Sequence, residues 1–240
     1  MSDIYMFNDH LIMISKNKIP QEHKHLAFHI IISMNKEIEW NIQGKVIKCK
    51  GICINSNVSH STNSSNIEAI TVFFLPFSSY VISIQEKYLK GSAYSILDEN
   101  IINEVCCLYK KNKNNEELFN LEFLSTCGIE AIKEYNCDSR VKEIITYIKN
   151  IATIDNSIMN QLSRLVYLSQ SRLSHIFKQQ TGITLHSYLA FEKLHKTHQY
   201  YIEGKTLTEA CLLAGFSSSS HFSATCKRMF GMSIREIYKR

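Results

Sequence analysis

Residues 215–231 read GFSSSSHFSATCKRMFG, a stretch in which a run of four serines precedes an apolar repeat. Serine runs next to glycine are typical of loops and flexible linkers. Apolar residues nevertheless follow at helical spacing, at Phe222, Cys226 and Met229, before the closing Gly231. The spacing therefore predicts a helix whose exposed face carries small polar side chains, and not a linker.

The same pattern occurs a second time, earlier in the chain. LSRLVYLS at 162–169 aligns with ACLLAGFS at 210–217 at an offset of 48, and SRLSHIFK at 171–178 aligns with SHFSATCK at 220–227 at an offset of 49. Each copy predicts a short helix, a turn with a serine N-cap (Ser169 or Ser217), and a second helix ending at a glycine (Gly182 or Gly231). This is the helix-turn-helix pattern, whose second helix enters the major groove of DNA. We assign the two units to residues of about 157–182 and 206–231.

A longer helix is predicted to join the two units, from about Thr184 to Glu203, with Gly204 after it. Twenty residues at ~1.5 Å each span ~30 Å. Successive major grooves on one face of B-DNA are ~34 Å apart. We therefore expect a single chain to read two adjacent major grooves of double-stranded DNA.

The second helix of each unit is predicted to have an apolar inner face and a polar outer face. The inner stripes are Leu173-Ile176-Phe177 and Phe222-Cys226-Met229-Phe230. The predicted DNA-binding residues, which include one lysine of the joining helix, are Gln170, Ser171, Arg172, Ser174, His175, Lys178, Lys193, Ser218, Ser219, Ser220, His221, Ser223, Lys227 and Arg228. We expect Ser171, Ser174 and His175 to read bases, and the basic residues of the set to hold phosphates.

Charge divides the chain into two parts. Residues 140–240 carry 14 Lys and Arg against 6 Asp and Glu, a net of +8, whereas residues 1–139 carry 13 against 16, a net of −3, which together give the total of +5. The basic part predicts a polyanion as partner. The first ten residues lack a signal peptide and no window approaches the ~18 apolar residues of a membrane helix, so we expect a cytoplasmic protein without a membrane partner.

The N-terminal part is predicted to be β structure followed by helices. Strand patterns occur at 28–33, 38–42, 46–49, 52–54 and 67–75, with a Gln43-Gly44 turn after the second. Beyond Pro76 two helical stripes follow: Ile101, Val105 and Leu108, then Leu118, Leu121, Leu124 and Ile132. The predicted fold class is α+β, a small antiparallel β-barrel with appended helices and then an all-α domain. We place the first domain at 1–137 (β part about 1–76, helical part about 80–137) and the second at 138–240.

Residues 140–240 resemble the DNA-binding domain of the AraC/XylS family of bacterial transcription regulators, through LSQSRLSHIFKQQTGITLHSYL (168–189) and LTEACLLAGFSSSSHFSATCKRMFGMSIREIY (207–238). The N-terminal part is similar to the family's cupin-like sensor domain through HKHLAFH (23–29) and the segment ending at His60. The resemblance implies a homodimeric activator that acts with RNA polymerase under control of a small effector. Family members carry a long polar residue where Ser219 stands and an arginine where Ala224 stands. We therefore expect the second unit to contact the DNA phosphates more than it reads bases.

The N-terminal candidates for ligand binding are His23, His25, His29, Trp40 and His60. We expect them to contact the effector, or the histidines to make the domain respond to pH. Three or four imidazoles also suit Zn or Fe, and a metal-dependent cupin-type enzyme with a degenerate helical domain is the alternative function. Because closeness in sequence does not establish ligand geometry, the prediction is a protein with no metal, no cofactor and no catalytic residue.

Overall fold

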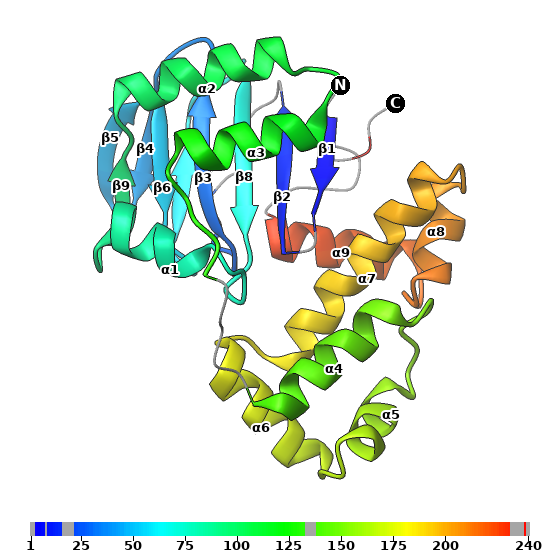
Figure 1. Cartoon of the computed structure of the whole chain (residues 1–240). Coiled ribbons are helices and arrows are strands. Elements are labelled where there is room, and N and C mark those ends of the chain that lie inside the picture. Colours follow the sequence, from blue (N-terminus) through cyan, green and yellow to red (C-terminus); the bar gives the residue numbers. More distant parts are fainter. Residues whose placement is uncertain (1–2, 8, 16–21, 133–137, 231–237, 239–240) are drawn as a thin grey trace. The chain divides into compact units, whose positions relative to one another are not determined.

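A computed structural model describes residues 3–7, 9–15, 22–132, 138–230 and 238 of the 240-residue chain (Figure 1). The chain divides near residue 133 into an N-terminal unit of strands and helices and a C-terminal helical unit. None of the helices within these ranges is long and apolar enough to cross a membrane.

The N-terminal unit contains two antiparallel sheets. The six-stranded sheet has the order β1-β2-β8-β3-β6-β9 and the three-stranded sheet the order β5-β4-β7. The strands are β1 (Asp3–Met6), β2 (His10–Ser15), β3 (Phe28–Ser33), β4 (Ile38–Ile42), β5 (Lys45–Cys49), β6 (Gly51–Ile54), β7 (His60–Thr62), β8 (Ala69–Phe74) and β9 (Tyr94–Ile96). Gln43 and Gly44, both with positive φ, form the two-residue turn between β4 and β5.

Strand β3 illustrates how the sheet separates two cores. All six of its residues are buried, because Ile30 and Ile32 pack on the helical side while Ile31 packs toward the three-stranded sheet. α2 (Glu99–Lys111) and α3 (Glu116–Thr126) lie across one face of the six-stranded sheet (Figure 1). α1 (Val81–Ile84) and the π-helical turn η1 (Gln85–Leu89) contribute to the same core. The unit therefore has three layers: helices, large sheet and small sheet.

The predicted antiparallel β fold is confirmed, and β3 and β4 begin and end where their sequence patterns predict. The strands β1, β2, β7 and β9 were not predicted. Three of them are sheet-edge strands of three or four residues, which are too short for an alternating pattern to stand out.

Helix α3 buries a different face from the predicted one. Leu118 and Leu121, two members of the predicted apolar stripe, are 39% and 64% exposed, whereas Phe119 and Phe123 are buried. Residues 118–124 read LFNLEFL, so two apolar stripes overlap, and the stripe with the larger aromatic side chains faces the sheet. In α2 the predicted Val105 is buried, but the other buried positions are Ile102 and Tyr109, each one residue after the predicted Ile101 and Leu108.

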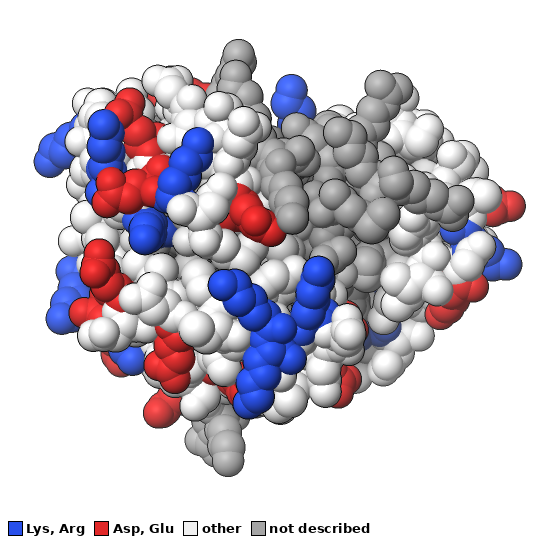
Figure 2. All heavy atoms as spheres, turned by 90° about the horizontal axis from the view of Figure 1, so that it is seen from above, with Lys and Arg blue, Asp and Glu red and all other residues white. Residues whose placement is uncertain are grey.

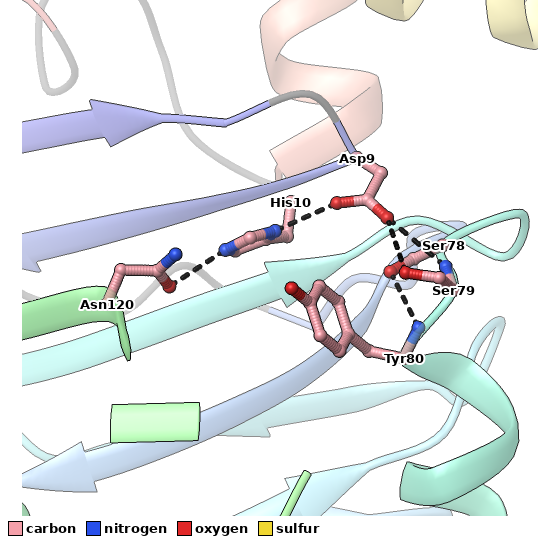
Figure 3. Close-up of polar contacts among 6 residues, drawn as sticks. All are labelled: Asp9, His10, Ser78, Ser79, Tyr80 and Asn120. Carbon is pink, nitrogen blue, oxygen red and sulfur yellow. Dashed lines mark hydrogen bonds and ion pairs between the residues drawn. The ribbon is translucent and has the colours of Figure 1, made fainter. Parts of the chain in front are cut away.

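A buried polar chain ties β2 to α3 and to the segment after β8 (Figure 3). The Nδ1 atom of His10 lies 2.9 Å from an Asp9 carboxylate oxygen, and its Nε2 lies 2.9 Å from Asn120 Oδ1. The other Asp9 oxygen accepts a bond from the backbone N–H of Ser79 at 3.2 Å. Burial raises the pKa of Asp9, but hydrogen bonds from His10 and Ser78 outweigh this effect and hold the pKa below its usual value. Both ring nitrogens of His10 are therefore engaged within the fold.

The C-terminal unit consists of α4 (Ser139–Asn150) followed by two helix pairs and the helix between them. The pairs are α5 (Ile158–Leu165) with α6 (Gln170–Thr181) and α8 (Leu207–Leu213) with α9 (Ser219–Phe230), and α7 (Leu185–Ile202) joins them (Figure 1). The predicted joining helix is confirmed. The predicted inner stripes of both second helices are also buried: Leu173, Ile176, Phe177, Phe222, Cys226, Met229 and Phe230.

Candidate nucleic-acid interface

The turns that precede α6 and α9 contain equivalent hydrogen bonds. The N–H of Leu168 donates to the Ser163 carbonyl at 3.1 Å, and the N–H of Phe216 donates to the Cys211 carbonyl at 2.9 Å. Both members of the second bond lie 48 residues after their counterparts in the first, which is the offset of the sequence repeat. The repeat in sequence is therefore a repeat in structure, and both copies are helix-turn-helix units.

Tyr167 occupies in the first turn the position of Gly215 in the second. Its φ of 54° is in the left-handed region, which strains the backbone of a residue other than glycine. Its side chain is 94% exposed, so the ring buries too little apolar surface to offset this strain. We expect Tyr167→Gly to raise the free energy of unfolding by about 1 kcal/mol, and Tyr167→Ala, which keeps the strained backbone, to leave it nearly unchanged. Urea denaturation measures both. A glycine variant no more stable than the alanine variant would show that this turn stores no strain.

Serine N-caps begin both second helices, but in the second unit the cap is Ser218 and not the predicted Ser217. Ser169 Oγ accepts a bond from the N–H of Arg172 at 3.3 Å, and Ser218 Oγ accepts one from the N–H of His221 at 3.1 Å. The cap follows the later offset of the repeat, 218 − 169 = 49, because the inserted residue precedes it. Ser217 Oγ instead hydrogen-bonds the Nδ1 atom of His221 at 3.0 Å.

The predicted DNA-binding residues of α6 and α9 lie on the faces opposite the buried stripes. Ser174, Ser218 and Ser223 are half-buried, and the remaining members on these helices are exposed: Gln170, Ser171, Arg172, His175, Lys178, Ser219, Ser220, His221, Lys227 and Arg228. Neither helix contains Asp or Glu. These faces therefore present hydroxyls, imidazoles and cations, which are the groups that bind phosphates and base edges.

Two of the predicted residues have partners inside the helical unit. Gln170 Nε2 donates to Asn160 Oδ1 at 2.7 Å, which ties α6 to α5. Lys193 Nζ donates to the Gly215 carbonyl at 2.6 Å and lies 5.8 Å from the centre of the Phe216 ring. Because this bond ties Lys193 to the second turn, we do not count Lys193 among the proposed phosphate ligands.

Charge on the N-terminal unit is mixed. Seen from above in Figure 2, Lys and Arg side chains are interspersed with Asp and Glu side chains. Helix α2 carries both signs, with Glu99, Glu104, Lys110 and Lys111, and α3 carries only acidic charges, at Glu116, Glu117 and Glu122. A mixed surface attracts a polyanion less than a surface of one sign, so the exposed faces of α6 and α9 are the stronger candidates for a nucleic-acid interface.

Helix α7 sets the separation of the two units. Its 18 residues span ~27 Å, which is of the same order as the ~34 Å between successive major grooves. Gly182, with φ of 77°, ends α6 as predicted, and Thr184 caps α7 by accepting a bond from the N–H of Ser187. Gly231, the predicted end of the second unit, lies outside the described residues.

His195 of α7 makes the stability of the helical unit depend on pH. Burial, with the positive charges of His198, Lys196 and Lys149, lowers its pKa to about 4. Because the unfolded value is ~6.5, the neutral ring contributes stability above that pH, and this contribution is lost as the pH falls toward 4. Between pH 7 and pH 5 we expect His195→Gln to lose about 2 kcal/mol less stability than the wild type in urea denaturation. Equal losses would contradict this assignment.

Four predicted ligand-binding histidines, His23, His25, His29 and His60, converge in the N-terminal unit and are here termed the His cluster. The ring centres of His23 and His60 are 4.3 Å apart, those of His25 and His29 4.4 Å, and those of His29 and His60 4.7 Å. The structure therefore brings together side chains from the segment before β3, from β3 itself and from β7.

Two large aromatic side chains border the His cluster. Trp40 is buried in the core between the sheets, with its ring centre 6.3 Å from that of His60. Phe73 of β8 lies 5.4 Å from the His25 ring centre and was not singled out from the sequence. Residues 69–74 read AITVFF, and a strand that is apolar on both faces carries no signal of which side a residue occupies.

Known proteins are similar in sequence to this chain. A family described as a helix-turn-helix domain matches residues 162–240. The probable transcriptional regulator LumQ of Photobacterium leiognathi is 28% identical over 88% of this chain and 89% of its own length. The arabinose operon regulatory protein of Escherichia coli strain K12 is 30% identical over 49% of this chain and 41% of its own.

Solved structures of ToxT from Vibrio cholerae share the fold. The structure from strain O395 gives a TM-score of 0.52 at 14% identity, covering 99% of this chain and 96% of that one. A structure from strain SCE256 with an unsaturated fatty acid bound gives 0.50 at 10% identity, covering 95% and 94%. Two equivalent helix-turn-helix units, a joining helix and these relatives lead to one conclusion: residues 162–240 contain a helix-turn-helix domain, and the chain is similar to DNA-binding transcription regulators of the AraC/XylS type.

Proposed function

We propose that this regulator binds two adjacent major grooves of promoter DNA. In this proposal α6 supplies most of the base recognition, and α9 mainly contacts the DNA phosphates. The observation that carries the proposal is the pair of equivalent helix-turn-helix units, joined by one helix, whose second helices contain basic residues and no acidic ones. The spacing of ~27 Å along α7 supports simultaneous binding of both units.

The difference between the two second helices supports unequal roles. Helix α6 presents Ser171, Ser174 and His175, whose hydroxyls and imidazole can both donate to and accept from base edges. In α9 the His221 ring is hydrogen-bonded to Ser217, and exposed Ala224 can only touch a thymine methyl. Base specificity is therefore concentrated in the DNA segment that α6 contacts, here termed the first box; the segment that α9 contacts is the second box.

Four exposed cations are the proposed phosphate ligands: Arg172, Lys178, Lys227 and Arg228. Each lies on a second helix, beside the residues assigned to base reading. Contacts of this kind fix the register of a protein on DNA without carrying sequence information. They also make the affinity fall with salt, because each phosphate that is neutralised releases counterions.

We further propose that the N-terminal unit controls this activity as the binding site of a small effector, next to the His cluster and Trp40. The fatty acid bound in a ToxT structure supports ligand binding by a chain of this fold. The exposed Leu118 and Leu121 of α3 support association of two copies into a homodimer. The regulator then acts in the cytoplasm as an activator that recruits RNA polymerase.

A promoter reporter tests the regulatory part of the proposal. Production of the wild-type protein should increase transcription from a promoter that carries its binding site. The double variant Ser174→Ala/His175→Ala should abolish the increase, whereas Lys142→Ala, an exposed residue of α4 outside both units, should retain it. A decrease with the wild type would contradict the activator role, and no change would contradict promoter regulation.

A further inference from the structure

The backbone holds the His cluster in place from three parts of the chain. His23 and His60 form an antiparallel bridge, in which the N–H of each donates to the carbonyl of the other at 3.0 Å. His29 lies within β3, where every residue is buried, and His25 precedes that strand and is itself buried. Main-chain contacts therefore fix the positions of these residues.

The ring nitrogens of the His cluster are close enough to share one ion. One nitrogen each of His23, His25 and His60 lies within 4.8 Å of the other two. Two nitrogens bound to the same zinc ion at ~2.1 Å each are ~3.4 Å apart in a tetrahedral site. The remaining gap is of the size that small side-chain rotations close.

Hydrogen bonds to carbonyls leave other ring nitrogens of the His cluster available as lone-pair donors. The Nδ1–H of His60 donates to the Val58 carbonyl at 2.9 Å, which leaves its Nε2 as a lone pair. Nδ1 of His29 lies 3.4 Å from the Ala27 carbonyl, and its buried Nε2 has no hydrogen-bond partner among the described residues. The same holds for the buried Nδ1 of His25. Carbonyl bonds of this kind are the outer contacts that orient metal-binding histidines.

The hydrogen bonds to carbonyls favour a cation over an anion as the ligand. A ring whose Nδ1–H donates to a carbonyl, as that of His60 does, keeps an unprotonated Nε2. An unprotonated imidazole nitrogen is the form that binds a metal ion.

We propose that His23, His25 and His60 bind one divalent transition metal ion of the zinc class, with the buried His29 ring packed beside them. Imidazole ligands suit zinc, cobalt, nickel and copper more than magnesium or calcium. This reverses the expectation from the sequence that the protein binds no metal, since the structure provides the missing geometry. The ion would link the segment before β3 to β7, inside the unit proposed to receive the effector.

Calorimetric titration of EDTA-treated, reduced full-length protein with Zn²⁺ tests the site without DNA. We expect one ion per chain, and at least about tenfold weaker binding in His25→Ala and His60→Gln, because loss of even an outer contact of a metal site costs 10- to 100-fold. His186→Ala, which removes an exposed histidine of α7, is the matched control and should bind as the wild type does. Equal binding by all four proteins, or none by the wild type, would overturn the proposal.

The wild-type protein with Co²⁺ gives a second test that needs no substitution and does not depend on a variant folding. A four-coordinate site with three imidazole nitrogens should give intense visible bands. The weak spectrum of the hydrated ion, or the near-ultraviolet bands of cysteine thiolate ligation, would overturn the assignment to the His cluster. Because neither test involves DNA, failure here leaves the proposed DNA-binding function to be judged by its own experiments.

Discussion

Gly215→Ala should lower the free energy of unfolding of the helical unit by about 3 kcal/mol, the sum of backbone strain and overpacking. Gly215 has φ of 98°, and a Cβ atom there would overlap the carbonyl oxygen of Ile154. The neighbouring Ala214 carbonyl accepts a bond from the N–H of Ile154 at 3.3 Å, so the two backbones pass each other closely. A side chain at this position would push the second turn away from the segment before α5.

Gly182→Ala separates strain from steric overlap and is the matched control for this experiment. Gly182 also has positive φ, 77°, but an added Cβ would meet nothing within 4 Å. Its substitution should cost only about 1 kcal/mol of backbone strain. Urea denaturation of the two variants gives the comparison directly. If Gly215→Ala and Gly182→Ala lower the free energy of unfolding equally, the contact between Gly215 and Ile154 does not constrain the second unit.

Ser174→Ala/His175→Ala should reduce discrimination between the preferred DNA site and single-base variants of its first box. A lost base contact is worth about 1–3 kcal/mol, so preference at the affected positions should fall by roughly 5- to 150-fold. The reason is that both side chains lie on the outer face of α6, next to an N-terminus fixed by the Ser169 cap. Competition binding with a panel of substituted sites at one salt concentration measures it. An unchanged base preference would show that Ser174 and His175 of α6 do not read the bases.

Lys227→Ala provides the contrast, because phosphate contacts carry no sequence information. The affinity of the Lys227→Ala variant for DNA should fall by a similar factor for every site. The slope of the logarithm of the DNA association constant against the logarithm of the salt concentration should decrease in magnitude by about one. Lys142→Ala on α4 should leave the slope unchanged and serves as the control for a lost surface charge. A change of base preference in Lys227→Ala would contradict the division of roles between α6 and α9.

The helical unit was predictable because its pattern is local. Phe222, Cys226 and Met229 recur at the helical period, and the repeat shows the same turn twice. The cap at Ser218 was missed because two adjacent serines can each cap a helix, and only the position of the inserted residue decides between them. The bond of Lys193 to the Gly215 carbonyl was missed because it joins positions 22 residues apart.

The N-terminal unit was less predictable because its decisive contacts are non-local. The sequence LFNLEFL contains two candidate faces for α3, and only packing against the sheet selects the phenylalanines. The His cluster depends on the pairing of His23 with His60, which no local pattern encodes. The four histidines could be chosen as candidates from the sequence, whereas the direction of their lone pairs required the carbonyl contacts of the fold.

Selection of bound DNA from a random pool at fixed salt, with the full-length protein, tests the central claim most directly. The selected sites should contain two boxes whose centres lie one helical turn apart, with strong base preference in one box and weak preference in the other. The strong box should lose its preference when the pool is selected again with Ser174→Ala/His175→Ala. Sequences without a common site, or a stronger preference in the box bound by α9, would contradict the account.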